Sequence, residues 1–286
     1  MTPTRSLPKD ENEKAARQKP EVILRIASAI VLAALALAAT LISPWSFLVL
    51  VMVGGGLITW EWGRLTRGNG FDGTALISAV AVAAVAVMGS FGRPDLALFL
   101  AAAAGAAILF AAPSRPQGGW AFAGLVYAAL PAFALVWLRS DAAYGAAAVI
   151  FLFAVAWTTD SASYGAGRLI GGPKLAPRIS PQKTWSGFIV GALTPAFVGI
   201  AFALVLKSTS PLMLALVSVA LALACQAGDL VESWVKRRFG AKDMSQLIPG
   251  HGGLLDRVDG LLFAAVLAAL IALRDPASPG HGLLLW

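Results

Sequence analysis

The sequence predicts an all-α polytopic integral membrane protein with about nine transmembrane helices. Of its 286 residues, 58% are hydrophobic and only 13% are charged, whereas about a quarter of the residues in a soluble domain are charged. The mean hydropathy of +0.76 agrees with this composition. Most of the surface is therefore expected to face lipid rather than water.

The apolar residues form continuous runs, and a membrane-spanning helix needs about 17–25 such residues. Helices are expected rather than a barrel because apolar and polar residues do not alternate within the runs. The first run is longer than a signal-peptide core, so we expect a retained helix. The runs are 24–42, 46–62, 74–91, 95–112, 118–138, 142–159, 187–206, 211–228 and 258–273.

Composition also divides the chain into regions. Residues 1–23 form a polar tail, expected to be cytoplasmic, and 24–286 a single multi-span domain. Within this domain, 24–158 carries few charges and is expected to be mainly scaffold, whereas 159–260 holds the catalytic site. Long polar loops in a compact protein are usually functional. Two such loops are expected, at 160–186 and 229–259.

The distribution of basic residues predicts the orientation in the membrane. If each run crosses once, the N-terminal tail and every second loop share one side and hold 18 of the 22 Lys and Arg residues. Positive residues favour the cytoplasmic side, so we expect both polar loops inside a cell (inner) membrane and the C-terminus outside. The net charge is +7, and the basic residues lie in loops between the apolar runs. This arrangement predicts anionic headgroups or phosphorylated substrates as partners rather than nucleic acid.

The start of the second loop carries polar side chains at helical spacing. If the preceding helix continues, Asp229, Ser233, Lys236 and Arg237 fall at i, i+4, i+7 and i+8 and share one face. A carboxylate, a hydroxyl and two cations on one stripe could hold a metal and a phosphate together. The alternative is an exposed helix end with an i, i+4 ion pair between Glu232 and Lys236.

The end of the second loop combines glycines with carboxylates. Three glycines close to His251 let backbone N–H groups approach an anion. Asp256 and Asp259 are helical neighbours at a membrane boundary, where carboxylates are costly unless they are paired or metal-bound. Oxygen ligands favour a hard cation such as Mg²⁺. The alternative is a salt bridge from Asp256 to Arg257 in a solvated turn.

Ser180 and Pro181 in the first loop are typical of a helix start, with serine at the N-cap and proline at N1. Lys183 and Thr184 would then lie in the first turn, where a helix N-terminus attracts phosphate. Capping alone would explain the serine and the proline, but not the glycines and cations beside them.

Together these residues resemble the signature of the phosphatidate cytidylyltransferase family. The likeness is specific over 160–260 and generic before it, with departures at Gln182, where the family often has Lys, and Ser186, where it often has Glu. The main signature is Ser233-x-x-Lys236-Arg237-x4-Lys242-Asp243, then Pro249-Gly250-His251-Gly252-Gly253-x-x-Asp256-Arg257-x-Asp259, with 13 positions specified in 27 residues. The upstream motif is Asp160…Tyr164-Gly165…Gly167-Arg168, then Ser180-Pro181-x-Lys183-Thr184-Trp185-x-Gly187.

The resemblance implies a Mg²⁺-dependent, homodimeric membrane enzyme of phospholipid synthesis that converts CTP and phosphatidate to CDP-diacylglycerol and pyrophosphate. We expect Asp229 and Asp256 to hold the metal, with Asp259 assisting. The expected catalytic residues are Asp229, Lys236, Arg237, Asp256 and Asp259. The expected substrate-binding residues are Ser180, Lys183, Thr184, Ser233, Lys242, His251, Gly252, Gly253 and Arg257.

Other functions stay open at this point. A related cytidylyl- or phosphotransferase acting on an isoprenoid lipid would have similar loops. A CDP-alcohol phosphotransferase is disfavoured because Asp259-Gly260 is not followed by the required x-x-Ala-Arg. A transporter would want ionisable groups at mid-span, and the spans are almost free of them. An assay with CTP and a panel of lipid acceptors would separate these functions.

Overall fold

The computed structural model describes residues 9–207, 210–248 and 252–286, with side chains from Leu24 onward except at 25 and 26. It confirms the predicted all-α class, because helices make up most of the described chain and one short hairpin supplies its only named strands. The helices are α1 (Lys9–Ile42), α2 (Pro44–Arg67), α3 (Gly73–Ser90), α4 (Pro94–Ala111), α5 (Arg115–Arg139), α6 (Gly145–Leu169), α7 (Trp185–Leu193), α8 (Ala196–Leu206), α9 (Pro211–Arg238), α10 (Leu255–Ala272) and α11 (Pro279–Leu284), and the strands are β1 (Lys174–Ala176) and β2 (Ser180–Thr184).

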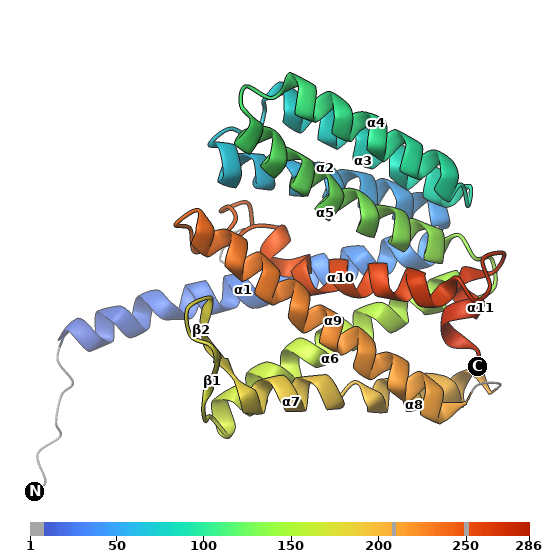
Figure 1. The fold of residues 1–286 in the computed structure, drawn as a ribbon. Helices are drawn as coiled ribbons and strands as arrows, with labels where there is room; N and C mark the ends of the chain where they lie inside the picture. The colour runs from blue at the N-terminus through green and yellow to red at the C-terminus, as the bar shows by residue number, and fades with distance from the viewer. Residues whose placement is uncertain (1–8, 208–209, 249–251) are drawn as a thin grey trace, which may run out of the picture.

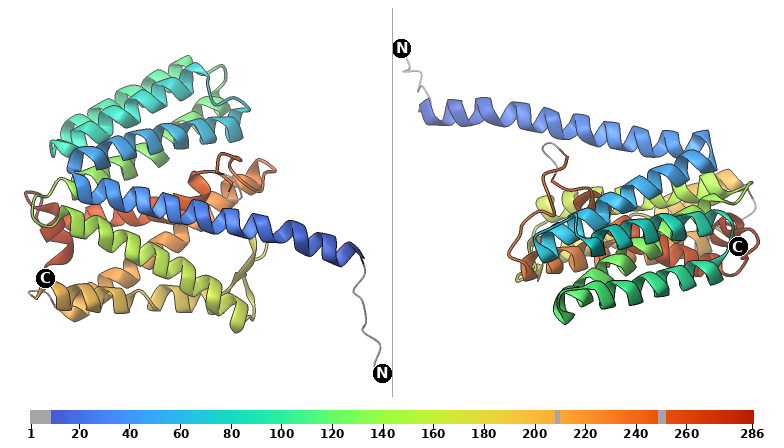
Figure 2. Two further views of the ribbon diagram at one scale, coloured as in Figure 1. Left: turned by 180° about the vertical axis from the view of Figure 1, so that it is seen from behind. Right: turned by 90° about the horizontal axis from the view of Figure 1, so that it is seen from above.

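The long helices form two packed groups (Figures 1 and 2). Helices α2 to α5 pack against one another, and α6 to α9 form a second group. Helix α10 joins the groups because it contacts α5 as well as α6 and α9. The first core includes Val82 and Ile108, the second includes Phe151 and Leu152, and all four side chains are fully buried. The end of α9 and the start of α10 belong to the first core through Val235 and Leu255.

Seven helical segments in the described chain are long and apolar enough to cross a membrane: α2 to α6, the α7–α8 pair and α9. The apolar part of α1, Ala27–Ile42, is shorter. Helix α10 has 18 residues, and charges at positions 256, 257 and 259 interrupt its first turns. Each of the nine apolar runs is helical, but the number of nine crossings stays a prediction.

Local signals explain where several helices begin and end. Ser43 caps α2 in a reciprocal capping box, and the adjoining Pro44 occupies its first turn. Gly68 ends the same helix with φ of +75°, a conformation that glycine adopts without steric cost. The predicted seventh span is divided into α7 and α8 because Pro195 follows Thr194 at the end of α7.

The first polar loop is shorter than predicted, and its helix start was predicted in the wrong place. Helix α6 continues through Asp160 to Leu169. Ser180 is not an N-cap, because 180–184 forms β2, which pairs antiparallel with β1. The true cap of α7 is Thr184, whose side chain accepts a hydrogen bond from the Gly187 N–H at 3.2 Å. Cross-strand pairing thus overrides the local Ser-Pro signal.

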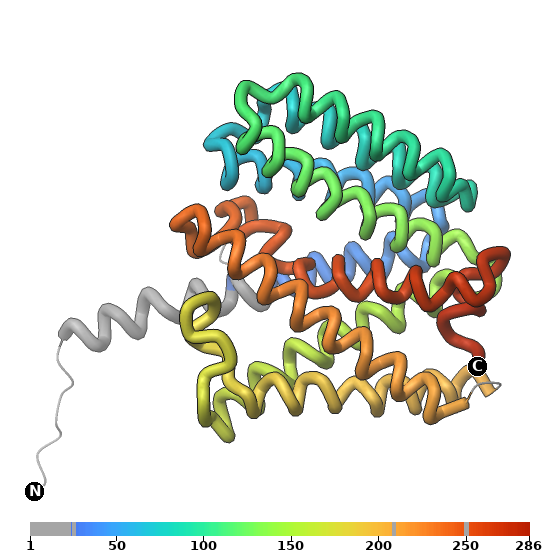
Figure 3. Tube along the Cα trace, viewed as in Figure 1, coloured from blue at the N-terminus to red at the C-terminus, as the bar shows by residue number. Residues whose placement is uncertain are grey.

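The second polar loop is also shorter, because α9 continues to Arg238 as the stripe hypothesis required. The backbone reverses again at α10, so the hairpin, the end of α9 and the start of α10 lie at one end of the bundle (Figure 3). We call this the site end. The loops that follow α3, α5 and α10 lie at the opposite end, with the unpredicted helix α11.

Candidate active site

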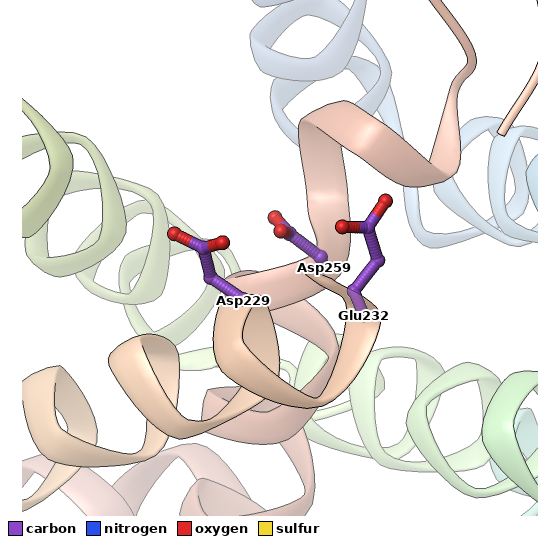
Figure 4. Close-up of side chains that lie close together, drawn as sticks. All are labelled: Asp229, Glu232 and Asp259. Carbon is purple, nitrogen blue, oxygen red and sulfur yellow. The ribbon is translucent and has the colours of Figure 1, made fainter. Parts of the chain in front are cut away.

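Three carboxylates meet where α9 crosses α10. Asp229 and Glu232 come from α9 and Asp259 from α10, and one oxygen of each lies within 4.8 Å of the others (Figure 4). We call this group the carboxylate cluster. Helical spacing places Asp229 and Glu232 on one face of α9, and the crossing of α10 supplies the third acid.

Two glycines allow the helices to come this close. Gly228 precedes Asp229, and a Cβ there would lie 2.6 Å from the Asp259 carbonyl oxygen. Gly260 follows Asp259, and its Cβ would lie 3.0 Å from the Cys225 carbonyl oxygen. Any larger side chain at either position would push the helices apart, and with them the acids of the cluster.

Glu232 is the cluster member that most requires a partner. Its side chain is 1% exposed, and its carboxylate has no hydrogen bond of good geometry, although the side chains of Lys236 and Asp256 are adjacent to it. Its negative charge is offset by the ion pair of Oε2 with Lys236 Nζ at 2.6 Å, a cation that also pairs with Asp256. Buried carboxylates are costly unless they are paired, hydrogen-bonded or bound to metal. This donor set of three carboxylates fits a hard divalent cation.

Asp256 borders the cluster, because its side chain interacts with Glu232, but it is not one of the three grouped acids and it serves the loop that precedes α10. It accepts hydrogen bonds from Lys236 Nζ at 2.7 Å, from the Met244 N–H at 2.9 Å and from the Gly253 N–H at 2.8 Å. A Cβ at Gly252, where φ is +87°, would lie 3.0 Å from its Oδ2. These contacts place Asp256 where it closes the loop onto α9, and its role as a metal ligand stays a prediction.

Lys236 links the carboxylate cluster to Asp256. Its ammonium group pairs with Glu232 and with Asp256. The i, i+4 ion pair between Glu232 and Lys236, which was the non-functional alternative in the sequence analysis, is therefore present. It is buried rather than exposed, since 13% of the lysine side chain and 1% of the glutamate side chain are accessible.

The hairpin contributes a second cation. Lys183 in β2 forms an ion pair with Asp229, which also accepts a 3.4 Å hydrogen bond from Ser233 Oγ. Asp160 on α6 interacts electrostatically with Asp229, Lys183 and Arg257. Residues of the main signature and of the upstream motif thus meet at one site.

Arg237 departs from the predicted stripe. Its guanidinium donates to the Ile179 carbonyl oxygen at 3.3 Å and to the Ala241 carbonyl oxygen at 3.1 Å. It therefore connects α9 to the hairpin turn, and its role as a catalytic residue stays a prediction.

The remaining predicted residues lie around this centre in different settings. Thr184 is 5% exposed and is used as a helix cap. Ser180 lies at the far end of β2, opposite Ala176. Lys242 and Arg257 are exposed at the site end, and His251 lies outside the described residues.

Sequence reasoning missed two residues of the expected scaffold. Glu61 on α2 is fully buried and accepts hydrogen bonds from the loop before α10. The signal was available, because an ionisable residue inside an apolar run is rare and usually has a function. Tyr127 on α5 has a buried hydroxyl without a hydrogen-bond partner and interacts electrostatically with all three cluster acids.

Comparison with known proteins gives the family. The model of the cytidylyltransferase family matches residues 23–273. The chain is 40% identical over 246 residues to a phosphatidate cytidylyltransferase of Brucella abortus (strain 9-941), covering 86% of this chain and 91% of the relative. It is 50% identical over 102 residues to a Mycobacterium leprae protein of the same name, covering 36% and 33%. A Rickettsia bellii protein of that name is 40% identical over 112 residues, covering 37% and 48%.

The family match extends over nearly all the apolar helices as well as the polar loops, and the Brucella match covers 86% of the chain. They confirm the likeness that the signature residues suggested. The chain belongs to the cytidylyltransferase family and is a nucleotidyltransferase built as a multi-pass membrane protein.

Proposed function

We propose that the protein transfers the cytidylyl group of CTP to the phosphate of phosphatidate, giving CDP-diacylglycerol and pyrophosphate. The observation that carries this proposal is the carboxylate cluster, bordered by Lys183 and Lys236 at the polar end of an apolar bundle. The names of the Brucella, Mycobacterium and Rickettsia relatives support the same reaction.

The chemistry makes few demands on a general base. A phosphate monoester has a second pKa of about 6, so the lipid phosphate is anionic at neutral pH and one of its oxygens can attack the α-phosphorus of CTP. The bond from that phosphorus to the β-phosphate oxygen breaks, and pyrophosphate leaves. The protein must bring two anions together and offset their charge.

We propose Mg²⁺ as the cofactor, held by Asp229, Glu232 and Asp259. Asp229 is common to this set and to the pair predicted from sequence, whereas Asp256 is already occupied by three hydrogen bonds. The bound cation would neutralise charge on the phosphates during transfer. The incomplete hydrogen bonding of Glu232, whose partner Lys236 is shared with Asp256, supports this assignment.

The cations of the chain then have separate tasks. Lys183 and Lys236 are held by carboxylates at the cluster, so each is presented at a fixed place to an arriving phosphate. Lys242 and Arg257 are exposed at the site end and are proposed to attract the anionic substrates. The charged side chains of Lys and Arg form strong charge-assisted hydrogen bonds with phosphate oxygens.

The decisive assay uses purified protein in lipid, CTP and a panel of acceptors. Phosphatidate, an isoprenoid phosphate and an isoprenoid alcohol should be offered separately, each with Mg²⁺ and with excess chelator. We expect CDP-lipid only with phosphatidate and Mg²⁺. If product formed with an isoprenoid acceptor but not with phosphatidate, the isoprenoid lipid would be the substrate instead. Solute flux in liposomes without any CDP-lipid would overturn the proposal that the protein is this enzyme.

We also propose that the site end faces the cytoplasm from an inner membrane. The support is the excess of basic residues on that side, 18 of 22 if every apolar run crosses once. Reporters fused to each terminus would test it. The expected result is an internal N-terminus and an external C-terminus, and termini on the same side would remove the nine-span topology.

We propose a homodimer on the strength of the family resemblance. Mass measurement of the detergent-solubilised protein, corrected for bound detergent, should give twice the chain mass of 29.5 kDa. If the protein had a monomeric mass at every dilution and stayed active, a dimer would not be required for activity.

A further inference from the structure

Glu61 is a buried acid in a helix that is otherwise suited to lipid. It lies on α2, its side chain is 0% exposed, and α2 is among the seven candidate spans. A carboxylate in such a place is costly and persists when specific partners compensate it. The partners of Glu61 all belong to the segment that leads into α10.

The contacts use both oxygens of the carboxylate. Oε1 accepts hydrogen bonds from Ser245 Oγ at 2.6 Å and from the Leu254 N–H at 2.8 Å. Oε2 accepts one from the Leu255 N–H at 2.8 Å. A Cβ on Gly253 would lie 2.5 Å from Oε1, so glycine is needed for the backbone to come this near.

These contacts replace a missing helix cap. The N-cap residue of α10, Leu254, makes no side-chain capping bond. The first N–H groups of a helix lack intrahelical partners and carry partial positive charge, which a carboxylate satisfies well. Glu61 therefore caps α10 from a different helix, across 193 positions of sequence.

The capped turn is the one that carries the chemistry. Asp256 follows Leu255 directly and holds Lys236, and Asp259 lies one turn further on in the carboxylate cluster. The described residues between Gly240 and Leu254, which are 241–248 and 252–253, form no named helix or strand. Glu61 and Asp256 are two carboxylates that anchor these described residues through side-chain hydrogen bonds.

We propose that Glu61 is a positioning residue for nucleotidyl transfer: by anchoring the loop before α10 and capping that helix, it sets where Asp256 and Asp259 stand. The inference rests on the proposed function only for its kinetic readout. The hydrogen bonds of Glu61 go to Ser245, Leu254 and Leu255 rather than to the carboxylate cluster, so its effect passes through the loop and the start of α10.

The opposite end of the bundle offers a matched control. Asp141 is 6% exposed and also accepts hydrogen bonds from a serine and two backbone N–H groups of a later segment. These donors are Ser278 Oγ at 2.5 Å, the Gly280 N–H at 3.0 Å and the His281 N–H at 3.2 Å. Asp141→Asn therefore removes the same kind of anchor far from the carboxylate cluster.

The experiment compares Glu61→Gln, Ser245→Ala and Asp141→Asn in two measurements. Hydrogen–deuterium exchange of the purified proteins reports whether amides at 252–258 or at 278–282 lose protection. Steady-state kinetics with CTP and phosphatidate separates kcat from KM. Glutamine keeps the shape of Glu61 but turns one acceptor oxygen into a donor that faces a backbone or hydroxyl donor.

In Glu61→Gln we expect faster exchange at 252–258 and a kcat lower by about 100-fold, the scale of a displacement of about 1 Å, with little change in KM for CTP. Ser245→Ala should show the same pattern more weakly, because it keeps both backbone bonds. Asp141→Asn should exchange faster at 278–282 and keep the wild-type kcat.

Folded Glu61→Gln with wild-type kcat would overturn the proposal, and so would an equal loss of kcat in Asp141→Asn. If Glu61→Gln does not fold, Ser245→Ala decides, since faster exchange at 252–258 with a lowered kcat supports the proposal and an unchanged kcat refutes it. If the wild type forms no CDP-lipid, the proposed function fails instead. The exchange comparison then still decides whether Glu61 fixes the loop.

Discussion

The two ends of the helical bundle solve the burial of acidic groups in different ways. At the opposite end, Asp141 is surrounded by donors, including the Ala143 and Tyr144 N–H groups at 2.9 and 2.8 Å. At the site end, Glu61 and Asp256 are similarly matched by donors, but the Glu232 carboxylate relies on the Lys236 ammonium, which it shares with Asp256. A buried carboxylate with several donors holds a structure together, whereas one with an incomplete set of donors is a candidate ligand for a cation. The number of donors around a buried carboxylate therefore distinguishes anchoring acids from candidate metal ligands better than residue type does.

The largest expected effect is at the carboxylate cluster. Asp229→Asn and Asp259→Asn keep side-chain size but remove the charge that a hard cation needs, and bound metal supplies several kcal/mol, so turnover should fall on the order of 1,000-fold. CDP-lipid formation across a Mg²⁺ titration would measure it, with partial recovery at high Mg²⁺. Asp95→Asn is the control, because Asp95 is exposed and paired with Arg93 at the opposite end. Near-normal turnover in folded Asp229→Asn would remove the metal site.

Asp256→Asn tests whether an anchor can be told apart from a ligand. Breaking a buried ion pair costs roughly 3–5 kcal/mol of stability, and displacing the loop should reduce turnover by about 100-fold. Because Asp256 lies outside the carboxylate cluster, we expect the Mg²⁺ concentration for half-maximal activity to stay unchanged. A shift of that midpoint to higher Mg²⁺ would show that Asp256 is a ligand, as the sequence predicted.

The cations provide a finer test within the site end. Lys183→Met removes the charge that pairs with Asp229 while keeping an unbranched side chain. A charge-assisted contact is worth roughly 1.5–3 kcal/mol, so kcat/KM should fall by about 10- to 150-fold. Arg238→Met is the matched control, because Arg238 is exposed beside the same site. Equal kinetics in both variants would mean that Lys183 only balances local charge.

The smallest effect on activity is expected at the opposite end. Burial raises the pKa of Asp141, but hydrogen bonds from Ser278 and from backbone N–H groups outweigh it and hold the pKa below its usual value. A lowered folded-state pKa stabilises the fold above the unfolded value of about 3.9, and this is lost as the pH falls through the folded value.

Asp141→Asn should therefore keep wild-type turnover while unfolding more easily at neutral pH, by about 1–3 kcal/mol. The gap in thermal stability between variant and wild type should narrow below about pH 4. Thermal unfolding in detergent at several pH values would measure it. A gap that stays constant down to low pH would show that the carboxylate charge is not what stabilises this end.

Much of the molecule could be predicted from local sequence. Long apolar runs force helices, because backbone groups in lipid must be satisfied within their own segment, and all nine runs are helical in the structure. Helical spacing also placed Asp229 and Ser233 together on α9 once that helix was known to continue. The signature residues led to the family, which the comparisons confirm.

Tertiary structure decided which acids belong together. Glu232 is one turn from Asp229 in sequence, but its burial and its incomplete hydrogen bonding arise only when α10 crosses α9 at Gly228 and Gly260. The strand at 180–184 depends on pairing with β1, which a local Ser-Pro signal does not report. The role of Glu61 depends on a partner 193 positions away. Helix formation is a property of neighbouring residues and could be inferred from sequence, whereas burial and hydrogen-bond partnership are properties of the packed helices and appear only in the fold.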